Sequence, residues 1–408
     1  PLYTGQGAAP DIGADEVDMS PWWARDVSAT ALVSPPDGSY VTVGAPLTLQ
    51  GSLLNEGYLD LPGVPLRLLI SGPLPSTATV YDQVVVSGPV ASLASASVTF
   101  PGGTLSAPGT YQVTLATELA GDEYPDNDTF SGSLTAVSLL SGSYDVGAGL
   151  APPFNSLTSA LAHLVAIGAG GPVTFRLVND FYNTASGETF PIFVDHYPGE
   201  SATNRLTIRP SPAARPTIST TSTSALILRG VDYFTLDGSS GSGSLRFLRL
   251  TTTGTASGGA VLWARPTTGS DGVSHAVLQN LIVGGSGTGK PLIGIGFGGV
   301  SPALTSDGSG HDGNVIRNCL VQGAEIGIYL AGSVTDRNEG NLVEQCELGG
   351  EISSEYLYRC GLLLRYEDAP IVRNNRIYGL HGSSVTTAGA TLGIALGLGP
   401  SPDPFTQP

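Results

Sequence analysis

The sequence predicts an all-β protein in which a β-sandwich is followed by a parallel β-solenoid, and three observations lead to this prediction. Glycine (56 residues) and proline (30 residues) are abundant among the 408 residues, whereas charged residues make up only 12%. Short apolar runs recur between turn residues, as in strands joined by tight loops. Only one segment has the spacing of an amphipathic helix. A hydrophobic content of 41% argues against disorder.

The charge balance disfavours several classes of partner. The formal net charge is −17, and Lys290 is the sole lysine. A surface this poor in cations cannot neutralise phosphates, so nucleic-acid binding is not expected. Docking onto anionic lipid headgroups is disfavoured for the same reason. No run of 18 apolar residues occurs, so no transmembrane segment is expected.

Residues 1–26 include Ala9–Glu16 (APDIGADE). This phrase resembles one that closes many bacterial β-helix surface domains. The segment is therefore expected to be the tail of a preceding β-helix or a linker, with an unstructured leader as the alternative. Because the sequence has no initiator Met and no signal peptide, it reads as a piece of a longer protein.

Residues 27–137 carry alternating apolar runs with turn signals at short intervals, which is the pattern of a β-sandwich. Turn residues such as Pro35–Gly38 and Asn55–Gly57 separate the runs. The expected strands are Tyr40–Val43, Leu47–Leu53, Pro65–Ile70, Thr79–Val86, Ala96–Phe100, Tyr111–Thr117 and Thr129–Val137.

Three phrases in this region carry a family resemblance: Gly51–Gly57 (GSLLNEG), Pro108–Tyr111 (PGTY) and Asp122–Asp128 (DEYPDND). They resemble the CARDB-like branch of immunoglobulin-like domains in bacterial exported proteins. The resemblance implies an immunoglobulin-like β-sandwich over residues 27–137. The antibody-type cysteine pair and core tryptophan are missing, so the likeness is to the fold alone.

Residues 138–153 are rich in Gly, Ser and Pro and are expected to form a linker. The one predicted helix follows, and Asn155 or Ser156 can cap its start. Gly168 is expected to end it. The helix should bury a stripe made of Leu157, Ala160, Leu161, Leu164 and Val165. A short helix at this place is expected to cap the open first rung of a parallel stack over residues 154–408.

Beyond Pro172, short apolar strands alternate with polar turns. The expected strands are Val173–Val178, Leu206–Ile208, Ala225–Leu228, Tyr233–Leu236 and Leu245–Leu250. A weak internal repeat then appears in Val277–Val283, Val315–Val321, Leu342–Leu348 and Ile371–Ile377. These segments begin 38, 27 and 29 residues apart, which suits one coil of a solenoid with a longer insertion in the first interval.

One repeat position carries amide side chains. A stacked column of amides can satisfy its own hydrogen bonds from coil to coil and stabilise parallel stacking. The expected structural ladder consists of Asn280, Asn318, Gln345 and Asn374. Cys319 and Cys346 occupy the next position. Packing as small residues explains them, and a reactive thiol or a disulfide is the alternative.

These coils resemble the pectin-lyase-like superfamily of right-handed parallel β-helices, over roughly residues 138–400. The resemblance is carried by the repeated segments and implies the fold. It leaves function open, because this fold is known in lyases, hydrolases, adhesins and passive stalks.

Polygalacturonase-like hydrolases carry Asn-Thr-Asp, Asp-Asp, Gly-His-Gly and Arg-Ile-Lys phrases, and the sequence has none of them. The nearest fragment is Gly310–Asn314 (GHDGN). Its His311 and Asp312, together with Glu344, form a weak candidate acid/base site. The alternative is a solvated loop that enters the next coil. A lyase is not expected, because no calcium-ligand trio accompanies a cationic base.

Structural calcium is the one cofactor that the sequence suggests. Asp122, Asp126 and Asp128 fall within seven residues in a loop of the first region, and calcium prefers hard oxygen ligands. The spacing does not match an EF-hand. The alternative is an ordinary turn before the last strand.

The sequence thus favours a non-enzymatic structural or adhesive protein, secreted or on the cell surface. It is expected to self-associate head-to-tail into a fibre, stalk or sheath, or to adjoin neighbouring domains of a longer chain. The alternative is a carbohydrate-active enzyme (a polysaccharide lyase or glycoside hydrolase) or a glycan-binding module on the flank of the β-helix. A groove lined by Tyr329, Tyr356, Tyr358 and Tyr366 would favour that alternative.

Overall fold

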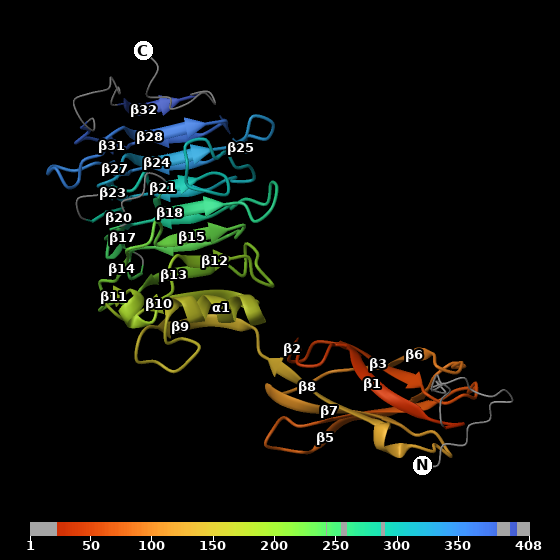
Figure 1. Ribbon diagram of the computed structural model, residues 1–408. Coiled ribbons are helices and arrows are strands. Elements are labelled where there is room, and N and C mark those ends of the chain that lie inside the picture. Colours follow the sequence, from red (N-terminus) through yellow and green to blue (C-terminus); the bar gives the residue numbers. More distant parts are fainter. Residues whose placement is uncertain (1–22, 242, 254–258, 287–289, 382–391, 398–408) are drawn as a thin grey trace, which may run out of the picture. The chain divides into compact units, whose positions relative to one another are not determined.

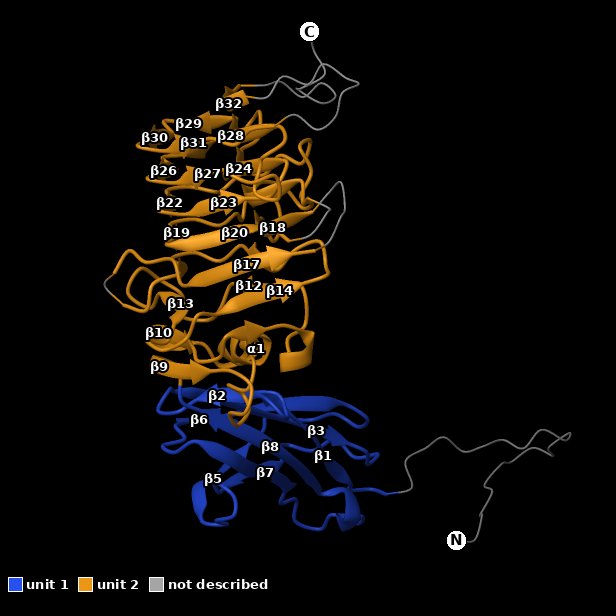
Figure 2. Cartoon of the chain, turned by 90° about the vertical axis from the view of Figure 1, so that its left-hand side faces the viewer, with its two compact units in different colours: residues 1–138 blue, residues 139–408 orange. Residues whose placement is uncertain are grey.

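The computed structural model describes residues 23–241, 243–253, 259–286, 290–381 and 392–397 (Figure 1). The chain divides into two compact units, residues 1–138 and 139–408 (Figure 2). Regular structure in the described part is almost entirely β-strand, with one α-helix and two short 3-10 turns. None of the described helices is long and apolar enough to cross a membrane. The phrase Ala9–Glu16, predicted to end a preceding β-helix, lies outside the described residues.

The first unit contains two sheets. The smaller sheet is antiparallel, in the order β1 (Val27–Ser34), β3 (Leu47–Asn55) and β6 (Ser95–Gly103). The larger sheet has the order β2 (Tyr40–Thr42), β8 (Thr129–Val137), β7 (Gly109–Thr117), β4 (Pro65–Ser71) and β5 (Thr79–Val86). Only the β2–β8 pair is parallel. All seven predicted strands are present. β1 was not predicted, because its small residues give little contrast between its two faces.

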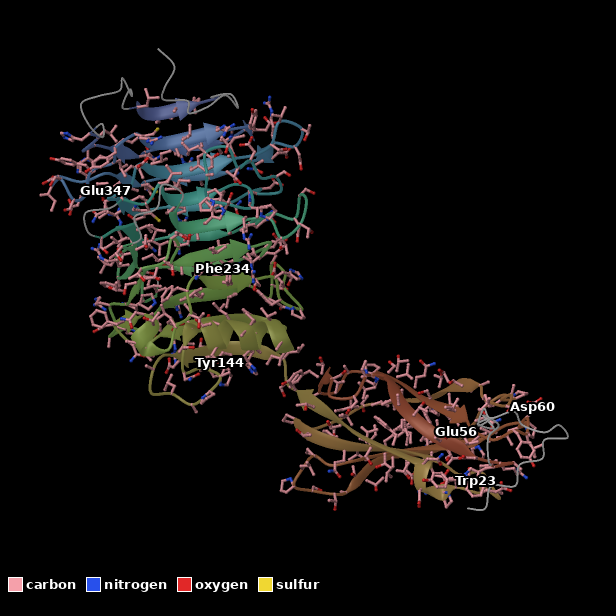
Figure 3. All side chains as sticks on the ribbon, viewed as in Figure 1. Trp23, Glu56, Asp60, Tyr144, Phe234 and Glu347 are labelled. Atoms are coloured by element: carbon pink, nitrogen blue, oxygen red, sulfur yellow. The ribbon has the colours of Figure 1, made fainter. Side chains whose placement is uncertain are left out.

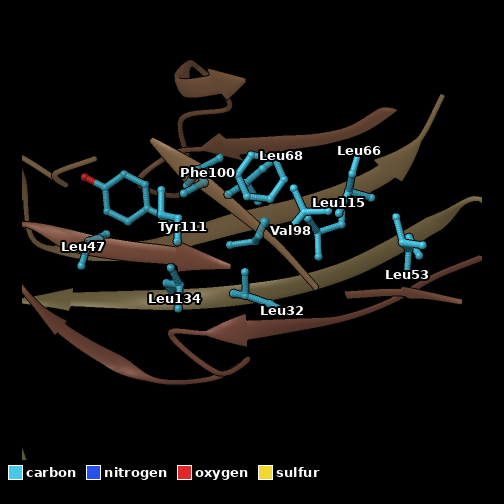
Figure 4. Close-up of a cluster of buried hydrophobic side chains, with 14 of the residues drawn as sticks. Leu32, Leu47, Leu53, Leu66, Leu68, Val98, Phe100, Tyr111, Leu115 and Leu134 are labelled. Carbon is cyan, nitrogen blue, oxygen red and sulfur yellow. The ribbon is translucent and has the colours of Figure 1, made fainter. Parts of the chain in front are cut away.

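The two sheets of the first unit share one hydrophobic core (Figure 4). Leu49, Leu53 and Leu66, on alternate positions of their strands, are completely buried. Such alternation is what a strand with one face in a core requires. Gly51 interrupts the series on β3, since a Cβ there would lie 2.8 Å from the side chain of Leu115. The glycine therefore permits the close approach of the two sheets.

The second unit begins with β9 (Leu140–Val146), which pairs in parallel with β10 (Ala169–Leu177). The linker predicted over residues 138–153 is therefore wrong in its first half, which is a strand. Only the two end residues of β9 are buried. The Ser141–Ser143 stretch between them has no apolar residue, so no alternating strand pattern is visible there.

Helix α1 (Leu157–Ile167) follows and packs against β9, β10 and β12. Ser156 is its N-cap, and the Ser156 hydroxyl accepts a hydrogen bond from the Ser159 N–H at 3.1 Å. The chain leaves the helix at Gly168 with a φ of +83°, a conformation that suits glycine. The buried stripe matches the prediction except at its end, where Ile167 is buried and Val165 is exposed.

Three parallel sheets form the solenoid, and each coil adds one strand to each sheet. The first sheet has the order β30 (Ile371–Arg373), β26 (Leu342–Glu344), β22 (Val315–Arg317), β19 (Val277–Gln279), β16 (Thr235–Asp237), β13 (Leu206–Pro210), β10 and β9. The second runs β11 (Phe181–Tyr182), β14 (Thr217–Thr220), β17 (Leu248–Thr252), β20 (Leu281–Gly285), β23 (Leu320–Gln322), β27 (Glu347–Leu348) and β31 (Arg376–Ile377).

The third sheet runs β12 (Ile192–Asp195), β15 (Leu226–Arg229), β18 (Ala260–Arg265), β21 (Ile293–Phe297), β24 (Ile326–Ala331), β28 (Cys360–Arg365) and β32 (Leu392–Leu396). A small sheet of β25 (Asn338–Glu339) and β29 (Glu367–Asp368) flanks the solenoid. The prediction of an all-β chain with a parallel solenoid is confirmed.

The internal repeat read from the sequence is the register of the first sheet. Val277 pairs with Val315, Val315 with Leu342, and Leu342 with Ile371. Residues at the same position of the repeat therefore occupy the same place on successive coils. The longer first interval is accounted for by the loop of residues 298–314, which connects β21 to β22.

Candidate functional site

The four amides of the predicted ladder form one corner of the solenoid. Each lies between a strand of the first sheet and a strand of the second. Each also has a left-handed backbone: φ is +59° at Asn280, +49° at Asn318, +56° at Gln345 and +57° at Asn374. Asparagine tolerates this conformation better than most residues do. The tight corner is therefore a second reason for asparagine at this position, and the sequence reading missed it.

Hydrogen bonds join part of this amide column. Asn318 Nδ2 donates to Asn280 Oδ1 at 2.7 Å, and Asn280 Nδ2 donates to Asp237 Oδ1 at 2.7 Å. Gln345 and Asn374 are both exposed, and their side chains make no hydrogen bond within the described part of the chain. Asn280 and Asn318 thus have their side chains hydrogen-bonded within the protein, whereas Gln345 and Asn374 face solvent.

An open cavity of about 660 Å³ follows this amide column. Amide, carboxylate and guanidinium groups line it together with glycine backbone. Its lining residues are Asp237, Gly241, Gly243, Ser244, Gln279, Asn280, Arg317, Asn318, Gln345 and Asn374. We call this surface the amide groove.

Two arginines hold the polar groups of the amide groove in place. Arg246 donates to Asn318 Oδ1 and to the Asn318 carbonyl, both at 2.9 Å. It also pairs with Glu347 at 2.7 Å, a residue labelled at the side of the solenoid in Figure 3. Arg317 donates to Gln279 Oε1 at 2.5 Å. Charges of both signs therefore balance one another beside the amides.

His311, the candidate catalytic base, is completely buried. Its Nδ1 accepts a hydrogen bond from the Val273 N–H at 3.0 Å, and its Nε2 donates to the Gly298 carbonyl at 2.9 Å. Burial lowers the pKa of His311 to about 4. The imidazole is therefore neutral near pH 7, and both its nitrogens are occupied.

A buried polar network surrounds His311 at the corner between the third and first sheets. Asn314 Nδ2 donates to the Val273 carbonyl, and Asn341 Nδ2 donates to the His311 carbonyl and to Glu367 Oε2. Asn338 Nδ2 donates to Glu367 Oε1 at 2.9 Å. Burial raises the pKa of Glu367 to about 7.

The sequence contained a signal for this network. Asn338-Glu339-Gly340-Asn341 repeats the pattern of His311-Asp312-Gly313-Asn314, four residues ahead of the aligned segments. The spacing between the two phrases is the spacing of the repeat itself. Extending the alignment upstream would have placed His311 in a column of hydrogen-bonding side chains.

Asp312 and Glu344 do not join His311 in a common site. Asp312 Oδ1 accepts a hydrogen bond from the Glu339 N–H at 2.7 Å. Asp312 lines a second open cavity of about 500 Å³ with His275, Gly313, Glu339, Gly340, Asp368 and Ala369. Glu344 lies at the far end of β26, opposite Arg317, and pairs with Arg373 at 2.8 Å.

Two of the three predicted calcium ligands accept hydrogen bonds from the protein itself. Asp122 accepts from the backbone N–H groups of Val27 and Tyr124, at 3.0 and 2.9 Å. Asp128 accepts from the Thr117 hydroxyl at 2.6 Å, and Asp126 is exposed on a short 3-10 turn. Among the described residues, no group of three or more His, Cys, Asp and Glu side chains is arranged to hold a metal ion.

The four tyrosines expected to line a groove do not do so. Tyr329 is completely buried, and its hydroxyl donates to the Leu304 carbonyl at 3.2 Å. Tyr356 stacks on His381 with the ring centroids 4.1 Å apart. Tyr358 lies beneath Lys290, whose ammonium group is 4.5 Å from the ring centroid. A groove lined by all four tyrosines is therefore not formed, because Tyr329 is inside the solenoid.

No family model and no curated protein matches this chain. Solved structures give matches at low similarity. The CARDB domain of a Pyrococcus furiosus protein in complex with di-metal ions is 16% identical, with a TM-score of 0.23, and the match covers 28% of this chain and 94% of that one. An alginate lyase from Paenibacillus sp. is 11% identical, with a TM-score of 0.27, covering 58% and 97%.

A family 28 exopolygalacturonase from Yersinia enterocolitica is 9% identical, with a TM-score of 0.22, covering 92% of this chain and 79% of that one. A CARDB domain and a polygalacturonase are thus among the structural neighbours. At these levels of similarity, the fold rests on the strand order and register described above.

Proposed function

We propose that this chain is a non-enzymatic, extracellular adhesive protein whose solenoid binds a neutral glycan along the amide groove. The observation that carries the proposal is the column of amides on successive coils, with Gln345 and Asn374 exposed and without protein hydrogen bonds among the described residues. An amide offers both a donor and an acceptor, which is what a sugar hydroxyl group needs from a partner.

The charge of the chain favours a neutral ligand over an acidic one. The net charge of −17 repels a polyanion over the whole molecule. The arginines nearest the amides are already engaged, Arg246 by Glu347 and Arg317 by Gln279. Arg317 lines the groove together with the Asp237 carboxylate, and these two opposite charges leave no net positive charge there for a uronate.

The positions and contacts of the candidate catalytic groups support a binding role rather than a catalytic one. His311 is buried with both ring nitrogens hydrogen-bonded, and Glu344 is paired with Arg373. A general acid/base pair needs two groups that can reach one substrate bond. His311 is buried at the corner between the third and first sheets, whereas Glu344 lies at the far end of β26.

The finer architecture belongs to the same proposal. We infer that the first unit is a CARDB-like member of the immunoglobulin-like domains, that the solenoid is right-handed, and that α1 caps its first coil. Self-association, expected from the sequence, is not needed for glycan binding.

The proposal is tested by affinity electrophoresis through gels containing a neutral polysaccharide (arabinoxylan or galactomannan) or an acidic one (polygalacturonate or alginate). The unmodified chain should be retarded by a neutral gel. The double variant Gln345→Gly/Asn374→Gly removes both amides and keeps the left-handed backbone accessible. It should bind about thirtyfold more weakly, since two hydrogen-bonding groups of about 1 kcal/mol each are lost.

Leu93→Gly is the matched control, because Leu93 is an exposed residue of the first unit with a φ of +58°. It should leave retardation unchanged. Equal retardation of the chain and the double variant would refute the groove as the binding site. Release of reducing ends or unsaturated sugars from any of the four polymers would instead favour the enzymatic alternative.

A further inference from the structure

Cys319 and Cys346 occupy the same position on two successive coils. The residues that follow them, Leu320 and Glu347, are register partners in the second sheet. The Glu347 N–H donates to the Cys319 carbonyl at 2.8 Å. The two cysteines are therefore side by side on neighbouring coils.

Both thiols point into the solenoid and interact with each other. Cys319 is completely buried and Cys346 is 1% exposed. The Sγ atoms lie at equivalent places, 3.3 Å from the Arg317 carbonyl oxygen for Cys319 and 3.4 Å from that of Glu344 for Cys346. A hydrogen bond from Cys319 lowers the pKa of Cys346, while burial raises the pKa of Cys319.

The backbone spacing at this place suits a covalent link. Neighbouring strands of a sheet lie about 4.8 Å apart, and disulfides join Cα atoms that are roughly 4.4 to 6.8 Å apart. Leu281 precedes the two cysteines in the column and Asn375 follows them, so the column offers one cysteine pair and no further partner. The third cysteine, Cys360, lies on β28 in another sheet, with its Sγ near the Leu362 and Gly393 carbonyls.

We propose that Cys319 and Cys346 form a disulfide that joins two successive coils when the chain folds under oxidising conditions. With oxidised glutathione as the oxidant, one cysteine thiolate attacks the glutathione disulfide and releases one reduced glutathione. The second cysteine thiolate then attacks the mixed disulfide and releases another. Two protein thiols lose two protons and two electrons, and one glutathione disulfide gains them.

The bond has a structural consequence for the amide groove. Cys319 directly follows Asn318, and Cys346 directly follows Gln345. A bond between the two sulfurs therefore joins the coil of Asn318, whose amide is hydrogen-bonded within the protein, to the coil of Gln345, whose amide faces solvent. The disulfide does not depend on the proposed glycan binding.

The proposal is tested by refolding the chain from guanidinium chloride in oxidised or in reduced glutathione. Each native product, verified by circular dichroism and size-exclusion chromatography, is then denatured in iodoacetamide and weighed by mass spectrometry. The oxidised product should carry one alkylated cysteine, Cys360, and the reduced product three. A proteolytic digest should contain the peptides of Cys319 and Cys346 joined by a disulfide.

Two variants keep the outcome unambiguous. Cys360→Ser should refold in oxidised glutathione with no alkylatable cysteine, whereas Cys319→Ser should retain two. Three alkylated cysteines in the natively folded, oxidised chain would overturn the proposal. A crosslink that involves Cys360 would overturn it as well.

Stability provides a second readout. The bond closes a loop of nearly thirty residues, for which the chain-entropy model gives an increase in the folded-to-unfolded ratio on the order of a hundredfold or more. In urea, the oxidised form of Cys360→Ser should therefore unfold at a higher midpoint concentration than its reduced form. The same comparison for Cys319→Ser should give no difference. Identical midpoints for the oxidised and reduced forms of Cys360→Ser would contradict the proposed link.

Discussion

At the scale of single residues, Glu367 is a carboxyl of the solenoid whose pKa is strongly shifted by burial. Its two carboxyl oxygens accept hydrogen bonds from Asn338 and Asn341, yet burial raises its pKa to about 7. The cost of removing a carboxylate from water thus exceeds the gain from two amide donors. The Glu367 carboxyl of the folded chain consequently changes its protonation state around neutral pH.

The first prediction concerns the pH dependence of stability at Glu367. Its folded pKa of about 7 lies above the ordinary value of 4.5, so its contribution to stability is fully present below the ordinary value. That contribution is lost as the pH rises through the folded value. Relative to the unmodified chain, Glu367→Gln should therefore gain about 1–3 kcal/mol of unfolding free energy between pH 4.5 and about pH 8.

Urea denaturation at several pH values measures this difference. Glu339→Gln is the control, because Glu339 is an exposed carboxylate one repeat earlier along the chain. Its stability difference from the unmodified chain should stay constant with pH. A constant difference for Glu367→Gln would show that its carboxyl ionises normally in the fold.

The sequence predicted which residues share a column but not what each one contacts. Asn280, Asn318, Gln345 and Asn374 could be aligned, because apolar neighbours repeat around them. The burial of His311 could not be predicted, since its ring contacts come from Val273, 38 residues earlier, and from Gly298 at the start of the same long loop. From the sequence alone, a histidine beside an aspartate in a glycine-rich loop suggests a catalytic site. The coil register is needed to show that the His311 ring is buried.

At the scale of elements, α1 depends on its first turn. The Ser156 hydroxyl accepts from the Ser159 N–H, and the Glu188 carboxylate accepts from the N–H groups of Leu157 and Thr158. Three of the free N–H groups of the helix start are thereby satisfied. The negative charge of Glu188 also suits the positive end of the helix dipole. The cap serine could be predicted, whereas the capping carboxylate comes from a later loop.

The second prediction concerns this cap. Ser156→Ala should lower the free energy of unfolding of the second unit by about 1 kcal/mol, because the Ser159 N–H loses its partner. The loss stays limited because Glu188 still holds the two preceding N–H groups. Ser159→Ala is the matched control. The Ser159 side chain makes no cap hydrogen bond, and alanine is favourable inside a helix. Equal denaturation curves for Ser156→Ala and the unmodified chain would contradict this role.

Strands with weak apolar contrast set the limit of prediction for elements. β1 and β9 were missed because small and polar residues fill them, as in Ser141–Ser143. Their partners, β3 and β10, are far along the chain and supply the pairing. A strand of this kind is defined by its neighbour more than by its own side chains.

At the scale of the whole molecule, the chain consists of two units with separate cores. The first core includes Leu49, Leu53 and Leu115 and draws only on residues of the first unit. The second unit buries its own residues, among them Leu262 and Phe297. The division into a sandwich region and a repeat region was visible in the sequence, because alternating apolar runs precede the predicted helix and the repeated segments follow it.

The third prediction follows from these separate cores. Leu115 is completely buried, and Leu115→Ala should destabilise the first unit by roughly 2–5 kcal/mol through lost contacts and a residual cavity. Calorimetry should record two transitions, of which Leu115→Ala lowers one. Leu262→Ala, at an equally buried residue of the second unit, should lower the other. A shift of both transitions by either variant would mean that the units unfold together.

The number of coils sets the length of the amide groove. Each coil adds one amide and advances the solenoid by one strand spacing, about 4.8 Å. The length of the groove can therefore change only in whole steps, one coil at a time. Duplicating the residues from 315 to 341 would lengthen the groove by one coil and one amide. Inserting a single residue at the corner would instead shift the following strand out of register with its neighbours.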